Sequence, residues 1–290
     1  MNTVWSTYIQ SIGTLYGSRA LRFSDLFKEQ YKEAFGIKAD AKILEIGCGP
    51  GALCEALLRW YPNSNISGID RDSNFIDFAR KNSADIDYRE ADAACLPYDD
   101  GSFDVTISNT VAEHIEPSAF YGEQRRVLKD GGVCIVLSAR RGINIKADCI
   151  KEESDFEKEL WERTEKYFID AMKRYEVCSY PQSEAELPMC MQKYGFKNVS
   201  TKYLTVNLTP DDPKYTKETA YAMINADRKN DIDNIDAFEY VAPGVVSREE
   251  AEALKKIVNE KYDKRISLYD QGKKQWDTNM SLTMVIRGEK

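Results

Sequence analysis

The chain has 290 residues, a net charge of −8 and a sequence pI of about 5.0. Its lysines and arginines form no long run, so we expect no nucleic-acid partner. Seven cysteines without a C-x-x-C pair, and His114 as the single histidine, disfavour a zinc site, and we expect no metal. The odd cysteine number is typical of reduced thiols. No signal peptide and no apolar run of about 20 residues is visible, so we expect a cytoplasmic protein without a membrane segment.

Residues 7–36 have apolar side chains at helical spacing, interrupted by Gly13 and Gly17. We predict an N-terminal helical lid over residues 1–36. Arg19 and Arg22 are three residues apart and share one helix face. We expect one of them, with Arg19 as the preferred candidate, to bind a ligand carboxylate, because a guanidinium matches a carboxylate with two hydrogen bonds. The alternative is that both are solvated surface arginines.

An apolar strand over residues 42–46 runs into a turn with three glycines, and a helix is predicted over 52–60. Glycines at 47, 49 and 51 allow a tight turn and let a ligand approach the backbone N–H groups. This pattern indicates a Rossmann-type nucleotide site. Glu45 is unusual there, because a phosphate ligand gains nothing from a nearby anion. A ligand with an ammonium group or ribose hydroxyls is better matched.

The next predicted strand, residues 65–70, ends in Asp70, about 20 residues beyond the glycines. A carboxylate at that position accepts hydrogen bonds from ribose hydroxyls and repels a 2′-phosphate. The alternative is that Asp70 caps the helix predicted over 73–82, together with Asp72 or Ser73.

Further along the chain, residues 88–98 read YREADAACLPY, and a strand is predicted over 103–109. The ordered motifs LEIGCGPG, GID, ADA…LPYDDGSFDVTISN and LKDGGV together resemble class I S-adenosylmethionine-dependent methyltransferases. The chain is most similar to the ubiquinone/menaquinone-biosynthesis-like group that acts on small molecules. The resemblance covers residues 41–137, about a third of the chain.

The resemblance implies S-adenosylmethionine as cofactor and assigns a part of it to each motif. The glycine turn, with Cys48 inside it and Glu45 behind it, and the strand-ending Asn109 would face the methionine end. Asp70 would hold the ribose and Arg71 would lie beside the adenine. Asp92 would accept from the adenine amino group while the Ala93 backbone serves a ring nitrogen. The alternative for Asp92 is a loop residue that satisfies turn N–H groups.

The alternation of strands and helices predicts an α/β fold with a doubly wound parallel sheet. The resemblance implies a Rossmann-like, seven-stranded sheet whose last strand is antiparallel and lies beside the sixth. We assign residues 37–139, 183–209 and 280–290 to this cofactor-binding core, with the fifth strand over 132–138. Two insertions, 140–182 and 210–279, leave the ligand side of the sheet. We predict that they form a helical cap over the methyl acceptor, with 227–236 as a mobile edge; a homodimer surface is the alternative.

The sequence therefore predicts a methyltransferase that acts on a small organic molecule by in-line displacement, with the acceptor atom unidentified. His114 is a candidate general base because its ordinary pKa suits proton transfer near neutrality, and Glu113 is an equally weak one. The alternative is that His114 packs or caps at a helix start. Arg140 and Arg141 would read an anionic substrate or else face water. Two other functions stay open: an NAD-dependent oxidoreductase, since Gly47, Gly49 and Ala52 also fit the dinucleotide fingerprint, and a non-catalytic cofactor-binding protein.

Overall fold

A computed structural model describes residues 2–290. Its seven-stranded sheet has the order β3-β2-β1-β4-β5-β7-β6. Strands β1 to β5 pair in parallel, whereas β7 runs antiparallel to both β5 and β6. This confirms the predicted fold class, including the antiparallel last strand beside the sixth. The strands are β1 (Lys42–Ile46), β2 (Asn65–Asp70), β3 (Asp87–Glu90), β4 (Phe103–Asn109), β5 (Leu128–Ile145), β6 (Lys197–Leu208) and β7 (Thr278–Glu289).

Helices cover both faces of the sheet because its central strands are apolar on both sides. Successive β1 side chains alternate between two apolar clusters: Ile43 packs in the first, and Leu44 and Ile46 pack in the second. The first cluster includes α2 (Lys28–Phe35), α3 (Ala52–Trp60) and α4 (Ser73–Asn82). The second includes α5 (Pro117–Val127) and α8 (Glu186–Lys193). The N-terminal segment forms a π-helical turn (Trp5–Ile9), α1 (Ile12–Arg22) and a 3₁₀ turn (Asp25–Phe27).

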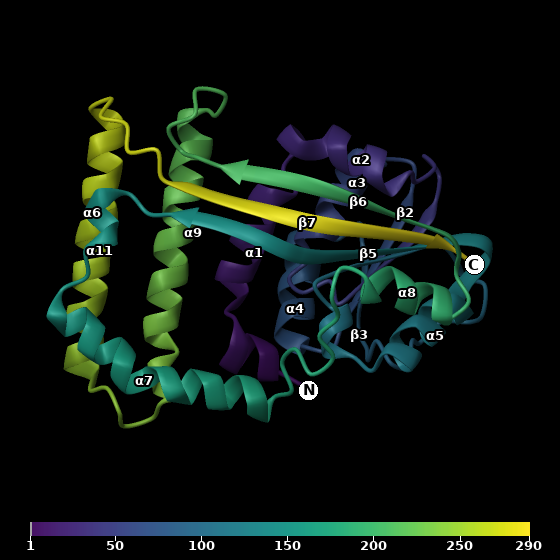
Figure 1. The fold of residues 1–290 in the computed structure, drawn as a ribbon, viewed down its shortest axis with the longest axis horizontal. Coiled ribbons are helices and arrows are strands. Elements are labelled where there is room, and N and C mark those ends of the chain that lie inside the picture. The colour runs from purple at the N-terminus through teal and green to yellow at the C-terminus, as the bar shows by residue number, and fades with distance from the viewer. Residues whose placement is uncertain (1) are drawn as a thin grey trace.

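A group of helices at one end of the molecule forms a cap, joined to the core by the long strands β5 and β7 (Figure 1). The cap has its own apolar cluster, to which Leu160, Phe238 and Leu254 belong. Leu160 and Leu254 are fully buried, and burying a side chain of that size contributes about 1.5–3 kcal/mol. The cap helices are α6 (Asp148–Lys151), α7 (Asp155–Arg174), α9 (Lys217–Asp236), α10 (Phe238–Val241) and α11 (Arg248–Asp270).

One sequence prediction about the cap connections is wrong. The fifth strand does not end at residue 138 but continues to Ile145, because β7 pairs with it as far as Thr278 and supplies the backbone partners. Residues 227–236, which the sequence predicts as a mobile edge, are helical, and their mobility stays a prediction. They belong to α9, which Thr216 caps by accepting from the Thr219 N–H, and the Asp231 side chain accepts from the Tyr262 hydroxyl of α11.

Candidate functional site

The glycine turn after β1 has the backbone geometry that the sequence predicts. Gly47, Gly49 and Gly51 have φ values of +67°, +52° and +93°, in the left-handed region that favours glycine. A Cβ on Gly47 would lie 2.5 Å from the Val111 side chain, so the position also leaves no space. The Cys48 N–H donates to the Ile69 carbonyl of β2 at 2.8 Å, which fixes the turn against the neighbouring strand.

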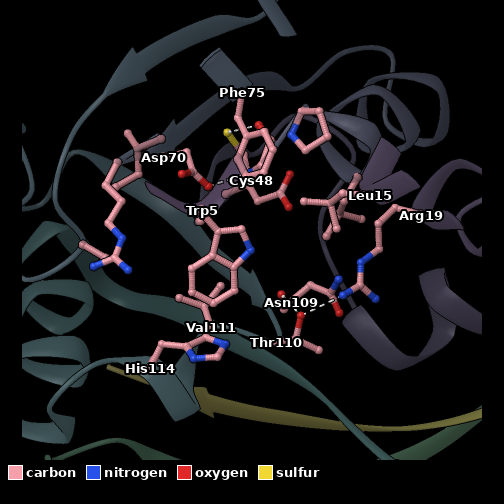
Figure 2. Close-up of a pocket in the computed structure, with 18 of the residues that line it drawn as sticks. Trp5, Leu15, Arg19, Cys48, Asp70, Phe75, Asn109, Thr110, Val111 and His114 are labelled. Carbon is pink, nitrogen blue, oxygen red and sulfur yellow. Dashed lines mark hydrogen bonds between the residues drawn. The ribbon is translucent and has the colours of Figure 1, made fainter. Parts of the chain in front are cut away.

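A cavity of about 290 Å³ lies at the carboxyl ends of β1, β2 and β4. Every predicted cofactor-binding residue lines it, and so does His114 (Figure 2). These residues are far apart in the sequence. They meet because the parallel sheet brings the carboxyl ends of its strands to one edge. The predicted residues in this lining are Arg19, Glu45, Gly47, Cys48, Gly49, Asp70, Arg71, Asp92, Ala93 and Asn109.

Glu45 is a buried carboxyl group at the base of the cavity, with 2% of its surface exposed. Its Oε2 atom has no hydrogen-bond partner within the described residues. Burial, with the nearby Asp70 charge adding to it, raises the pKa of Glu45 to about 8. Buried polar atoms are nearly always paired, so this group is suited to a partner that the chain itself does not supply.

Asp70 links the cavity to the glycine turn. Its Oδ2 accepts from the Gly49 N–H at 2.8 Å and its Oδ1 accepts from the Asp72 N–H at 2.9 Å. Burial raises the pKa of Asp70 to about 6, although these two N–H groups oppose the shift. The residue that caps α4 is Asp72, not Asp70. The Asp72 side chain accepts from the N–H groups of Asn74 and Phe75 at the start of α4.

Arg19 reaches the cavity from α1 and is not a solvated surface residue. Its Nη2 donates to Thr110 Oγ1 at 2.9 Å, just beyond the end of β4. Burial, helped by the charge of Arg22, lowers the pKa of Arg19 to about 10, so the group stays cationic at neutral pH. Arg22 points to the cap side instead, where its Nη2 donates to Asn279 Oδ1 at 2.9 Å.

Asp92, Ala93 and Arg71 form the outer rim of the cavity. Asp92 is exposed, and its Oδ1 accepts from the Ala94 N–H at 2.8 Å in a tight turn. The guanidinium of Arg71 lies 5.8 Å from the centre of the Trp5 ring, a cation–π distance.

His114 occupies the end of the cavity nearest the N-terminal segment. Its Nδ1 accepts from the Cys178 N–H at 2.9 Å, and its ring meets Trp5 edge to face at 4.8 Å. Burial lowers the pKa of His114, with Arg71 acting in the same direction and Glu113 opposing it. A neutral ring whose Nδ1 is an acceptor carries its hydrogen on Nε2. This geometry supports the packing alternative over the general-base role.

Several lining residues were not identified from the sequence: Trp5, Leu15, Phe75, Thr110 and Val111 (Figure 2). Four of them are apolar and the fifth is a threonine, and no local motif distinguishes them from core residues. Thr110 gives a signal only in the backbone, where its φ is +55°, a strained value for a β-branched residue. Trp5 reaches the cavity because Asp72 accepts hydrogen bonds from both the N–H and the hydroxyl of Ser6.

Comparison with known proteins supports this part of the chain as a methyltransferase domain. Residues 44–136 match the family model described as methyltransferase domain. The chain is 34% identical over 103 residues to a fatty-acid O-methyltransferase from Mycolicibacterium smegmatis, covering 34% of this chain and 37% of the relative. It is 33% identical over 105 residues to a ubiquinone biosynthesis O-methyltransferase from Bartonella tribocorum, covering 34% and 42%. These matches confirm the family resemblance drawn from the motifs, over a segment that spans about two fifths of the relatives.

The fold comparison extends over the whole chain. A phosphoethanolamine N-methyltransferase 2 from Haemonchus contortus, solved with S-adenosyl-L-methionine, is similar with a TM-score of 0.54. The similarity covers 100% of this chain and 60% of that chain at 14% identity, and it shows a shared fold. Separately, none of the helices within residues 2–290 has the length and apolar character needed to cross a bilayer.

Proposed function

We propose that this chain, whose residues 44–136 match the methyltransferase-domain family, transfers a methyl group from S-adenosylmethionine to a small organic molecule. The observation that carries the proposal is the buried carboxyl of Glu45 beneath the glycine turn, with its Oε2 unpartnered. An ammonium group is the natural partner for such a carboxylate. Glu45 argues equally against a dinucleotide pyrophosphate at this turn.

The residues around the cavity fit the other parts of the same cofactor. Asp70 stands where ribose hydroxyls would donate, while Asp92 and Ala93 lie on the rim where the adenine would lie. Arg19 remains cationic and faces the cavity beside Asn109, which suits the carboxylate of the methionine end. The turn glycines keep this wall of the cavity free of Cβ atoms, because a Cβ on Gly47 would meet Val111 and one on Gly49 would meet Leu15, both of which line the cavity. All of the residues named for these parts of the cofactor line one continuous cavity.

The cofactor supplies an electrophilic methyl group when bound, so the chain need only position the acceptor and manage its proton. Trp5, Val111 and Phe75 line the cavity with apolar surface, which excludes water from the reacting centre. His114 would orient the Cys178 loop through its Nδ1 instead of removing a proton.

Calorimetric titration with S-adenosylhomocysteine and with NAD tests the cofactor, and we expect heat with the first compound alone. Binding of NAD alone would support the oxidoreductase alternative. A panel of small acceptors, followed by release of S-adenosylhomocysteine, then tests turnover; binding without turnover on any acceptor would support a non-catalytic role.

Two further expectations belong to this proposal. The seven cysteines are all free, which supports a reducing compartment such as the cytoplasm. The acidic net charge supports a small-molecule acceptor over a nucleic acid. The cap is proposed to enclose that acceptor, and a homodimer surface stays the alternative for its outer face.

A further inference from the structure

A second cavity, of about 620 Å³, lies between the sheet and the cap. It shares Gln10, Arg19 and Asn109 with the cofactor cavity, so the two are contiguous. Its floor includes residues of β5 and β7, and α9 and α11 of the cap contribute Asp227 and Tyr262. The volume lies within the range of small-molecule sites, about 300–1,000 Å³. A molecule held here would lie next to the cofactor.

The cationic side chains of this cavity are unusual in having no anionic partner. Five line it: Arg19, Arg22, Arg140, Arg141 and Lys146. None of them forms an ion pair within residues 2–290, whereas other arginines of the chain, such as Arg126 and Arg265, do. Arg141 and Lys146 are exposed, so this cavity is open to solvent. In a chain with a net charge of −8, a concentration of cations without ion pairs in one cavity raises the local potential and attracts anions.

The hydrogen bonds of these arginines hold the guanidinium groups without neutralising them. Arg140 donates from Nη1 to the Gln182 carbonyl at 2.6 Å and from Nη2 to Ser138 Oγ at 2.8 Å. Its Nε is enclosed and has no partner within the described residues. Arg22 donates to the Ser18 carbonyl and to Asn279 Oδ1. All four acceptors are neutral, so the positive charge of both arginines is retained.

A β-bulge places two consecutive arginines in the lining. Neighbouring residues of a regular strand point to opposite faces, yet Arg140 and Arg141 both line this cavity. The register of β5 against β7 shifts between Ala139 and Arg141. Such bulges redirect side chains and are frequent beside functional sites. The bulge lies in the extension of β5 that the sequence did not predict.

The carboxylates of the lining are fewer and partly compensated. Three are present, Asp227, Asp231 and Asp277. Asp277 is 9% exposed and accepts from the buried Arg265, and Asp231 accepts from the Tyr262 hydroxyl at 2.8 Å. Asp227 forms no ion pair within the described residues, although the charges of Arg22 and Lys146 are near enough to lower its pKa against the larger effect of burial. Five cations therefore face three carboxylates, one of which is already paired from outside the cavity. Because Arg19 is assigned to the cofactor carboxylate, four of the five cations remain for the acceptor.

We propose that the cavity between the sheet and the cap binds the methyl acceptor, and that the acceptor carries an oxyanion, either a carboxylate or a phosphate ester, on a small organic body. This inference rests on the proposed function. The planar guanidinium groups match both oxyanions with paired hydrogen bonds. Met223 and Ile150 add buried apolar surface for the organic body.

The test uses the full chain saturated with S-adenosylhomocysteine and four probes that share a phenyl ring: benzoate, phenyl phosphate, benzyl alcohol and benzylamine. We expect calorimetric binding of benzoate, of phenyl phosphate or of both, and none of the alcohol or the amine at equal concentration. Preference for phenyl phosphate would indicate a phosphate ester as the acceptor, and preference for benzoate a carboxylic acid. Binding of neither anion, or stronger binding of benzylamine, would overturn the inference.

The double variant Arg141→Gln/Lys146→Gln locates the binding. Neither side chain makes a hydrogen bond or ion pair within residues 2–290, so the substitutions remove charge without removing an internal contact. We expect an affinity loss of about tenfold or more. Arg174→Gln is the matched control, because Arg174 is exposed in α7 and lies outside the cavity lining. Equal anion affinity in the double variant and the control would overturn the inference. If S-adenosylhomocysteine itself fails to bind, the proposed function fails first, which keeps the two failures distinguishable.

Discussion

At the scale of single residues, Asp70 has two tasks, because it holds the glycine turn through the Gly49 N–H and also faces the cavity. We expect Asp70→Ala to weaken binding of S-adenosylhomocysteine tenfold to a hundredfold, since hydrogen bonds to a charged group contribute about 1.5–3 kcal/mol. In the unmodified chain, affinity should fall as the pH drops through about 6, where Asp70 gains a proton. Calorimetry at pH 5 and 7.5 measures both effects. Asp77→Asn, on the exposed face of α4, is the control; equal affinities of the two variants would remove Asp70 from the site.

Glu45 predicts a pH-dependent stability of defined sign. Its pKa is raised from 4.5 to about 8 in the folded chain, so the folded state keeps a proton that the unfolded state loses. The free energy of unfolding should therefore fall as pH rises from about 4.5 to 8. Glu45→Gln removes the ionisable group and with it this loss of stability. Between pH 5 and pH 8.5, the free energy of unfolding of the variant should therefore rise by roughly 2–4 kcal/mol relative to that of the unmodified chain. Urea unfolding at both pH values measures the difference, and a gain that does not change with pH would contradict the assignment.

At the scale of elements, the strands and helices of the cofactor-binding core could be predicted from the sequence, because each carries a local signal. The bounds of β1, α3, β2, α4 and β4 agree with the prediction to the residue. The extension of β5 could not be predicted in this way. Residues 139–145 include two consecutive arginines, a glycine and an asparagine, which interrupt the apolar pattern of the strand. They form a strand because β7, more than 130 residues later, pairs with them. Trp5 and Thr110 were missed for the same reason: tertiary contacts bring them to the cavity.

The N-terminal segment is the element best placed to act as a lid. Trp5 contacts His114 and Arg71 across the cavity. The start of the segment is held by hydrogen bonds to Asp72, Ser73 and Asn74 and by stacking of Tyr8 on Tyr175. Contacts of this kind open at low free-energy cost. We expect backbone hydrogen exchange over residues 2–22 to slow markedly when S-adenosylhomocysteine binds, while exchange in the cap helix α11 changes little. Hydrogen-exchange mass spectrometry gives both values in one experiment. Equal exchange of residues 2–22 with and without the ligand would exclude a closing lid.

At the scale of the whole molecule, the cap must be rigid if it is to hold an acceptor against the cofactor. Arg265 of α11 is fully buried and donates to Asp277, at the start of β7, and to Asp211, just after β6. Asp211 also accepts from the Gln275 and Trp276 N–H groups at 2.7 and 2.9 Å. One buried ionic cluster therefore connects a cap helix to the segment that follows β6 and to the segment that precedes β7. The cap is fixed at its base, which agrees with a preformed acceptor cavity.

This cluster gives the last prediction. Arg265→Leu would leave the buried carboxylates of Asp211 and Asp277 without their cation, and breaking a buried pair in this way costs about 3–5 kcal/mol. Arg163→Leu is the control, because Arg163 pairs with Glu250 at 2.8 Å where both side chains are about one third exposed. Its loss should be clearly smaller, because solvent screens an exposed pair. Urea unfolding of the two variants measures the difference.

The triple variant Arg265→Leu/Asp211→Asn/Asp277→Asn should recover part of the loss, since it removes the unpaired charges. If the cap alone loosens, Arg265→Leu should still bind S-adenosylhomocysteine but lose affinity for the anionic probes. A loss in Arg265→Leu no greater than in the control would show that the cluster does not fix the cap.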